Sequence, residues 1–200
     1  MMTTTTTATT YSDDVTFVLV PGLRDHVEDH WQTHLQKQLK RAVTVPPLEH
    51  DKLSRAARVG ALAKTLADVQ GPVVLVAHSA GAITTVHWAQ QASRPILGAL
   101  LATPSNLDEP LPEGYPALSQ LQAHGWTPVP RARLPFPAVL AASRNDPLSR
   151  FEASQSFAKD WGARLVDLGE VGHLNPASGY GRWDGVHGLL QPLTAGRVSA

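Results

Sequence analysis

Ser79, Asp146 and His173 are widely separated in the chain, yet they are the residue types of a nucleophilic triad. A serine hydroxyl is a weak nucleophile until a histidine takes its proton, and a carboxylate must hold that histidine in the right tautomer. Each of these residues follows an apolar stretch that we expect to be a strand. Because the carboxyl ends of parallel strands meet at one edge of a sheet, we expect the three side chains to lie together there.

Ser79 lies at the junction between an expected strand and an expected helix. Residues 73–77 are wholly apolar, which is typical of a strand buried on both faces, and the small residues Ala80 and Gly81 follow the serine. This arrangement matches the nucleophile elbow G-x-S-x-G, with Ala77 in place of the first glycine. An ordinary strand-to-helix junction that contains a serine is the alternative, and the surrounding pattern favours the elbow.

Two acids could orient the histidine. Asp146 stands in an Asn-Asp-Pro sequence that also suits a simple turn, and Asp167 is its rival. Because Asp167 lies inside the last expected strand and does not easily reach across, we predict Asp146 as the acid. His173 follows Gly172 in the loop after that strand, where an exposed loop histidine is the alternative. We expect His78, next to the nucleophile, to pack or to point away.

An oxyanion hole needs two N–H groups that point at the developing negative charge. The residue after the nucleophile supplies one, so we predict the backbone N–H of Ala80. The loop after the first expected strand, which begins with Pro21 and Gly22, supplies the other, and we predict the N–H of Leu23.

A row of histidines offers a metal site as a competing interpretation. His26, His30 and His34 recur every fourth residue near several carboxylates, a spacing that aligns side chains on a helix. The row lacks the H-E-x-x-H order, and the helix is expected to begin only near Asp29, which takes His26 out of line. We therefore predict no metal and no cofactor.

Apolar stretches alternate with segments of helical periodicity, which predicts parallel βαβ units. We expect about six parallel strands in the order 2-1-3-4-5-6 with helices on both faces, a three-layer α/β/α architecture. In the helix expected over 55–69, Ala57, Ala61 and Leu62 should face inward. Residues 103–137 are irregular, with one short helix expected over 117–123, and could form a flap over the site. The expected strands are residues 15–20, 42–45, 73–77, 96–102, 138–142 and 164–168, and the other expected helices are residues 31–40, 80–92, 149–161 and 183–193.

The composition favours one globular domain over residues 13–200, preceded by a flexible threonine-rich tail over residues 1–12. The 17 basic and 17 acidic residues balance, so we do not expect a nucleic-acid partner. The chain has no cysteine, which excludes thiolate catalysis and disulfides. It also has no apolar run long enough to span a bilayer and no signal-peptide pattern, so we expect a cytoplasmic protein that does not associate with membranes.

The chain resembles the small serine hydrolases of the retinoblastoma-binding-protein-nine and YdeN type, which have the α/β-hydrolase fold. The matching pieces extend from about residue 15 to 190 and are Val20-Pro21-Gly22, His30-Trp31, Ala77 to Gly81, Asn145-Asp146-Pro147 and Gly172-His173. The resemblance implies a minimal α/β hydrolase without a large cap domain. It also implies Ser79 as nucleophile, Asp146 as acid and His173 as base.

We expect hydrolysis of a small carboxylic ester through an acyl-enzyme, and the substrate could also be a thioester or an activated amide. Two alternatives stay open. The fold could serve as a non-catalytic protein-binding or regulatory module, because the family includes a member named for a protein partner. The same triad could also transfer the acyl group to another acceptor as an acyltransferase.

Overall fold

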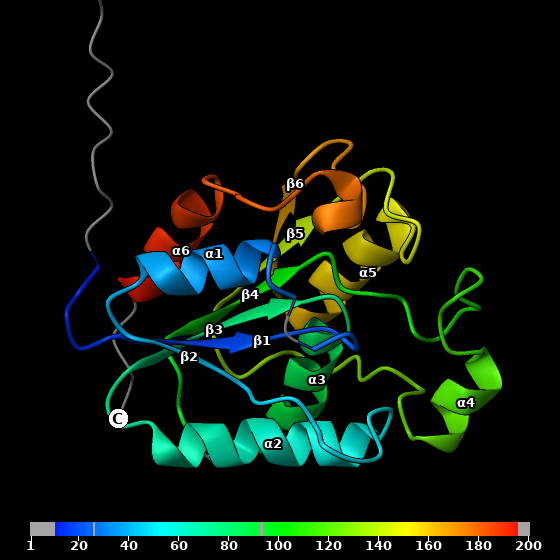
Figure 1. The fold of residues 1–200 in the computed structure, drawn as a ribbon, viewed down its shortest axis with the longest axis horizontal. Helices are drawn as coiled ribbons and strands as arrows, with labels where there is room; N and C mark the ends of the chain where they lie inside the picture. Colours follow the sequence, from blue (N-terminus) through cyan, green and yellow to red (C-terminus); the bar gives the residue numbers. More distant parts are fainter. Residues whose placement is uncertain (1–10, 26, 93, 196–200) are drawn as a thin grey trace, which may run out of the picture.

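The computed structural model describes residues 11–195 except 26 and 93, and six parallel strands form its central sheet (Figure 1). The strand order is β2-β1-β3-β4-β5-β6, as predicted. This order confirms the predicted α/β fold with a parallel sheet. The strands are β1 (Thr16–Val20), β2 (Ala42–Thr44), β3 (Val73–His78), β4 (Gly98–Ala102), β5 (Ala138–Ala142) and β6 (Arg164–Asp167).

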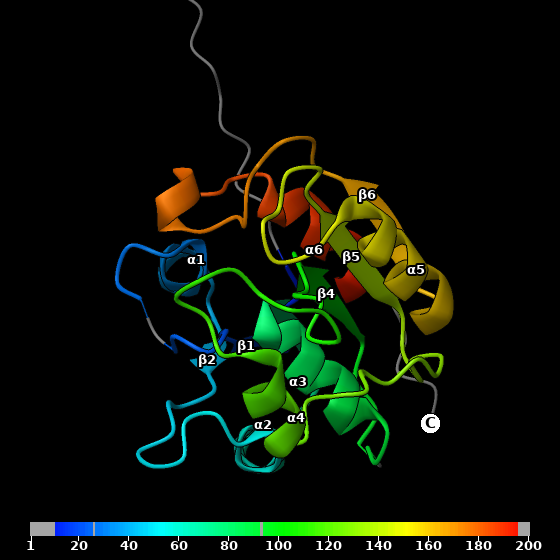
Figure 2. The same ribbon diagram turned by 90° about the vertical axis from the view of Figure 1, so that its right-hand side faces the viewer.

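Helices cover both faces of the sheet (Figures 1 and 2). One face packs against α2, α3 and α5, and the other packs against α1 and α6. The short helix α4 lies within the irregular segment, where it was predicted. The helices are α1 (Trp31–Gln38), α2 (Arg55–Asp68), α3 (Ala80–Ala89), α4 (Leu118–Ala123), α5 (Phe151–Trp161) and α6 (Val186–Thr194), with a 3₁₀ turn at Pro176–Ser178.

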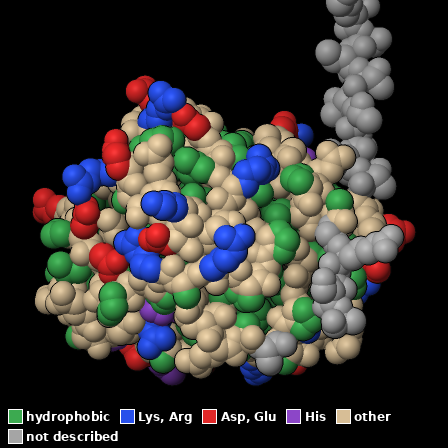
Figure 3. Space-filling model, turned by 180° about the vertical axis from the view of Figure 1, so that it is seen from behind, with side chains coloured by type: hydrophobic (Ala, Val, Ile, Leu, Met, Phe, Trp, Pro, Cys, Tyr) green, Lys and Arg blue, Asp and Glu red, His purple; other side chains and the backbone are tan. Residues whose placement is uncertain are grey.

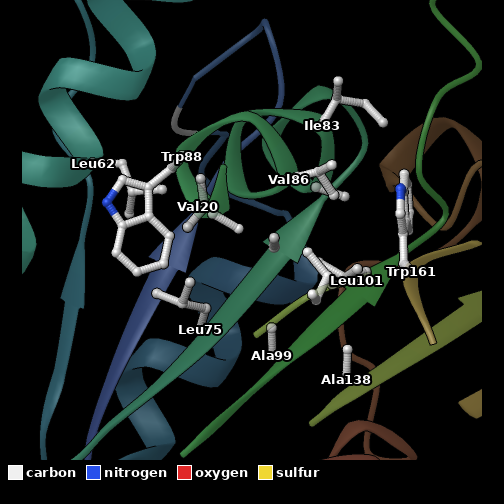
Figure 4. Packing of buried hydrophobic residues seen from close by; sticks show 14 of the residues in the cluster. Val20, Leu62, Leu75, Ile83, Val86, Trp88, Ala99, Leu101, Ala138 and Trp161 are labelled. Atoms are coloured by element: carbon white, nitrogen blue, oxygen red, sulfur yellow. The ribbon is translucent and has the colours of Figure 1, made fainter. Parts of the chain in front are cut away.

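The central strands are buried on both faces, which explains their almost continuous apolar sequences. Successive side chains alternate between the two helical layers, so that Leu75 and Leu101 contribute to the core on the side of α3. Figure 4 shows this core from close by, with Ile83 and Val86 of α3 packed over the sheet. The packing fixes the carboxyl ends of β3, β4 and β5 relative to one another.

The inward face of α2 differs from the predicted one. Leu62 is buried as predicted, whereas Ala57 and Ala61 are only partly buried. Arg58 occupies a buried position instead, because its guanidinium lies 3.0 Å from the Asp25 carboxylate, which offsets the cost of burying the charge. Apolar periodicity alone could not place a charged residue on the inner face.

Residues 1–10 of the predicted tail lie outside the described residues. Tyr11, which we also placed in the tail, contacts Phe17 edge-on with 4.9 Å between ring centroids, and its hydroxyl lies 2.8 Å from Nδ1 of His187. Acidic and basic side chains are interspersed on the face that Figure 3 shows. No helix among the described residues is long and apolar enough to cross a membrane.

Candidate active site

The strand β3 ends at His78 and the helix α3 begins at Ala80, so Ser79 alone makes the turn between them. Its backbone has φ 59° and ψ −129°, a conformation that L-residues rarely adopt. A side chain at Gly81 would place Cβ 2.1 Å from the carbonyl oxygen of Val20, so only glycine allows α3 to pack this closely on β1. These features are those of a nucleophile elbow.

The structure brings Ser79, His173 and Asp146 together at the carboxyl edge of the sheet. Nε2 of His173 lies 2.9 Å from Oγ of Ser79, and its Nδ1 lies 2.9 and 3.0 Å from the two carboxylate oxygens of Asp146. The side chains of His173 and Asp146 are only 6% and 2% exposed. A continuous chain of hydrogen bonds therefore leads from the hydroxyl to a buried carboxylate.

Contacts with neighbouring backbone groups hold the loops of Asp146 and His173 in place. The N–H of Leu148 donates to Oδ1 of Asp146 at 2.9 Å. The N–H of Gly172 donates to the side-chain oxygen of Asn145 at 2.7 Å, which joins the loop after β6 to the loop after β5. Gly172 has φ +58°, a conformation that glycine adopts without strain, and it leads directly into His173.

Asp167, the rival acid, has a different role. Its carboxylate accepts a hydrogen bond of 2.8 Å from Nε of Arg144 and lies at the end of β6, where it is partly exposed. Hydrogen bonds from Arg144 and from the N–H of Gly169 lower the pKa of Asp167. The pair is a surface ion pair and does not reach His173.

His78 does not merely pack beside Ser79, because it also contacts His173, the candidate base. Its side chain is buried, and its Nε2 lies 2.9 Å from the backbone carbonyl oxygen of His173. The ring of His78 lies between those of His30 and His173, with centroids 4.6 and 4.9 Å away. Burial lowers the pKa of His78 well below its ordinary value, and the neighbouring charges of His173 and His30 lower it further.

Sequence reasoning missed Ser105, a second serine beside Ser79. The two hydroxyl oxygens, Oγ of Ser105 and Oγ of Ser79, are 3.0 Å apart, and both side chains are buried. Ser105 lies in the loop after β4, close to Thr103, whose φ of +40° is unusual for a residue other than glycine. The one available signal was the position of this loop at the carboxyl end of a central strand.

Leu23 and Ala80, the predicted oxyanion donors, both line the pocket that contains Ser79. A Cβ at Gly22 would lie 3.2 Å from Cβ of Ser79, so the loop after β1 passes directly over Ser79. Within the described part of the chain, the backbone N–H groups of Leu23 and Ala80 donate no hydrogen bond.

Arg58 of α2 holds the loop after β1 in place. Its guanidinium donates to the carbonyl oxygens of Gly22 and Leu23 at 3.3 and 3.1 Å, and it pairs with Asp25 at 3.0 Å. Since the carbonyl groups are bound by Arg58, the peptide units after Gly22 are fixed in orientation. Sequence reasoning did not assign Arg58 any part in the site.

A pocket of about 250 Å³ opens above Ser79. The loops after β1, β4, β5 and β6 contribute to its walls, and of residues 103–137 only the first part, up to residue 116, lines the pocket. Later residues of that segment, among them Trp126 and Leu134, belong to the hydrophobic core. The apolar side chains of the walls include Leu23, Val27, Leu107, Leu111, Tyr115 and Pro176.

His30 and His34, the two described histidines of the row, have separate partners. His34 lies 2.8 Å from Asp29, whereas Nδ1 of His30 accepts the N–H of Gln32 and caps α1 on the side toward His78. His26 lies outside the described residues. Among the described residues, no group of three or more histidine or acidic side chains could hold a metal ion.

Comparison with known proteins places the chain among hydrolases. Residues 17–192 match the model of the family described as serine hydrolase. The chain is 31% identical to a protein described as a YdeN-like hydrolase from Pectobacterium atrosepticum, with 92% of each chain covered and a TM-score of 0.78. It is 18% identical to the ydeN gene product from B. subtilis, covering 91% of this chain and 99% of that chain, with a TM-score of 0.70. The type II thioesterase BorB from the borrelidin biosynthetic cluster is 13% identical, with 94% of each chain covered and a TM-score of 0.62. A search of curated proteins gave no match.

The six-stranded parallel sheet and the structural matches define an α/β hydrolase. The chain belongs to the serine hydrolase family, since the family match extends over most of its length. The predicted resemblance to YdeN-type hydrolases is thereby confirmed. The protein is an enzyme of the serine hydrolase class.

Proposed function

We propose that this hydrolase cleaves small carboxylic esters, with Ser79 as nucleophile, His173 as general base and Asp146 as the acid that orients His173. The observation that carries the proposal is the unbroken hydrogen-bond chain from Oγ of Ser79 through both ring nitrogens of His173 to the Asp146 carboxylate. An ionised carboxylate only accepts hydrogen bonds, so Nδ1 of His173 carries the proton and Nε2 is free to accept one.

The reaction begins when Oγ of Ser79 attacks the acyl carbon and its proton passes to Nε2 of His173. Asp146 stabilises the imidazolium that forms. His173 then gives the proton to the leaving alcohol as the carbon–oxygen bond breaks, which leaves an acyl-Ser79 ester. Water, activated by the again neutral His173, hydrolyses this ester and restores the enzyme.

The N–H groups of Leu23 and Ala80 bind the oxyanion of each tetrahedral intermediate. Ala80 is the first residue of α3, and the first amides of a helix have no partner within it. The contacts of Arg58 with the loop after β1 support the same role for Leu23, because they restrict the movement of its peptide unit.

The substrate is a small ester with an apolar acyl group. Apolar side chains dominate the pocket walls, and a cavity of about 250 Å³ limits the size of the group that fits. Thioesters and activated amides need the same attack on an acyl carbon, and one structural neighbour is named a type II thioesterase. The fold likeness to that neighbour motivates including a thioester in the test.

The test combines covalent labelling with a panel of p-nitrophenyl esters of increasing acyl length and one matching thioester. The wild-type protein should react with a fluorophosphonate and hydrolyse the short esters, whereas Ser79→Ala should do neither. Ser154→Ala is a matched control, because Ser154 is a buried serine of α5 that does not line the pocket. Full labelling of Ser79→Ala would contradict the proposal, and an unreactive, folded wild-type protein would favour a non-catalytic binding role.

Product analysis in the presence of a competing alcohol separates hydrolysis from acyl transfer. Release of the free acid as the main product supports the proposed hydrolase. If most of the acyl group is recovered as the ester of the competing alcohol, even at a low alcohol concentration, the protein is an acyltransferase instead.

A further inference from the structure

The nucleophile has two hydrogen-bonding neighbours, and the positions of the protons between them can be assigned. Oγ of Ser79 lies 2.9 Å from Nε2 of His173 and 3.0 Å from Oγ of Ser105. Because Asp146 fixes the proton of neutral His173 on Nδ1, Nε2 accepts the proton of Ser79. The hydroxyl of Ser79 has no second proton, so the contact with Ser105 is one in which Ser105 donates.

We infer that Ser105 is a further catalytic residue, which donates a hydrogen bond to Oγ of the nucleophile. The inference rests on the proposed function, since it assigns Ser105 a part in the same reaction. A hydroxyl oxygen has two lone pairs. Ser105 occupies one of them, and the other is left to attack the acyl carbon.

The donated hydrogen bond matters most when negative charge develops on Oγ of Ser79. This happens in acylation, while the proton moves to His173 and the bond to the acyl carbon is still forming. It happens again in deacylation, when the bond between Oγ and the acyl carbon breaks and the electron pair returns to the oxygen. Hydrogen bonds to charged groups are stronger than those to neutral ones, so the donor lowers both barriers. Ser105 keeps its own proton throughout.

The fold holds Ser105 in place from both sides. The strand β4 pairs directly with β3, and the N–H of Ser79 donates to the carbonyl oxygen of Ala102, the last residue of β4, at 3.0 Å. On the other side of Ser105, the N–H of Asn106 donates to the carbonyl oxygen of Leu148 at 2.9 Å. These contacts tie the loop of Ser105 to the elbow and to the loop of Asp146.

The hydroxyl of Ser105 has no hydrogen-bond partner other than Ser79 within the described part of the chain. Ser105 is 2% exposed, and Oγ of Ser79 is its one hydrogen-bond partner among the described side chains. A buried hydroxyl without a partner costs free energy, so its orientation toward the nucleophile is strongly favoured. A purely structural serine would bind backbone or a non-reacting side chain instead.

The experiment compares the wild-type protein with Ser105→Ala, Ser105→Thr and the control Ser154→Ala. Ser154 is also buried, and its hydroxyl oxygen lies 3.4 Å from that of Ser149. It does not line the pocket that contains Ser79. Two quantities are measured for each variant: the second-order rate of labelling by a fluorophosphonate, and kcat and KM for p-nitrophenyl acetate. Thermal unfolding of each variant checks that the fold is intact.

Ser105→Ala should lower both the labelling rate and kcat about 10-fold or more, because a hydrogen bond to a developing charge is lost, while KM stays almost unchanged. Ser105→Thr keeps the hydroxyl and should restore most of the rate, and Ser154→Ala should behave as the wild type.

Two results would overturn the inference and leave the proposed function standing. In the first, Ser105→Ala is labelled and turns over as fast as the wild type. In the second, Ser105→Thr is as slow as Ser105→Ala, which would assign the loss to packing instead of the hydroxyl. A wild-type protein that neither reacts with the probe nor hydrolyses any ester would instead contradict the proposed function itself.

Discussion

Nε2 of His78 lies 2.9 Å from the backbone carbonyl oxygen of His173. His78 directly precedes Ser79 in the chain, and the ring of His173 contacts the hydroxyl of Ser79. His78 is buried, and burial lowers its pKa, so its ring is neutral and its Nε2–H donates. Oγ1 of Thr103 lies 3.4 Å from the same carbonyl oxygen and is a weaker second donor. Through His78, the end of β3 fixes both Ser79 and the backbone of His173.

Replacing His78 tests this relationship as a positioning effect. His78→Phe fills a similar volume without a donor, whereas His78→Gln keeps an N–H at the end of its side chain. We expect the phenylalanine variant to lower kcat about 10-fold with little change in KM, because the buried carbonyl then keeps only the weaker donor Thr103 and can shift. The glutamine variant should retain more of the activity. Equal kcat values for the wild type and both variants would show that the contact does not position His173.

Matched substitutions to asparagine can show which of Asp146 and Asp167 acts with His173. Asp146→Asn should leave the fold intact but lower kcat about 10⁴-fold, because an amide in this place favours the wrong tautomer of the histidine. Asp167→Asn removes only the surface pair with Arg144 and should leave kcat nearly unchanged. The steady-state rate on a p-nitrophenyl ester measures both. A large loss in Asp167→Asn with a small one in Asp146→Asn would reverse the assignment.

The strand order and the meeting of Ser79, Asp146 and His173 follow from features that a sequence displays. Buried strands appear as apolar runs, right-handed crossovers restrict their order, and residues after parallel strands share one edge. The helix and strand ends in the structure lie within three residues of those predicted. The general arrangement therefore needs no knowledge of particular side-chain contacts.

Arg58, His78 and Ser105 could not be found in the same way. Arg58 interrupts the apolar pattern of α2, and its place on the inner face depends on Asp25, 33 residues earlier in the chain. The contact of Ser105 with Ser79 depends on the path of an irregular loop, which no periodicity describes. Such contacts depend on how side chains from different elements meet, so they become visible only when the packing is known.

The strained backbone of Ser79 predicts an unusual effect of glycine. At φ 59° and ψ −129°, glycine relieves a strain that alanine keeps, while both substitutions remove the hydroxyl and its hydrogen bonds. Such strain costs on the order of 1–3 kcal/mol, and the greater freedom of glycine in the unfolded chain offsets part of it. We expect Ser79→Gly to be about 1 kcal/mol more stable than Ser79→Ala in urea unfolding. A less stable glycine variant would show that the elbow is not strained.

Gly81 and Gly60 should respond in opposite ways to alanine. At Gly81 a Cβ would meet the backbone oxygens of Val20 and Pro21 at 2.1 and 2.6 Å, so Gly81→Ala must push α3 away from β1 and should cost about 3 kcal/mol or more. At Gly60, in α2, a Cβ has nothing within 4 Å, so Gly60→Ala should stabilise the helix by about 1 kcal/mol. Urea unfolding measures both changes. Equal stability of the two variants would contradict the close packing at the elbow.

His78 and His87 predict that stability falls as the pH drops below about 6.5, the ordinary pKa of histidine in an unfolded chain. Burial lowers the pKa of His78 well below this value and also lowers that of His87, so between the folded and unfolded pKa values the unfolded chain binds more protons. The free energy of unfolding must then decrease with falling pH, by at most about 1.4 kcal/mol per pH unit for His78.

Urea unfolding between about pH 7.5 and 5.5 measures this slope, because in that range most carboxylates stay ionised in both states. His78→Phe removes the titrating ring and should flatten the dependence, whatever its effect on the stability at neutral pH. His50→Gln is the control, since His50 is an exposed histidine that does not line the pocket and should keep the wild-type slope. If His78→Phe retains the full wild-type slope, His78 is not the neutral buried donor to the His173 carbonyl, and the positioning role argued for it fails as well.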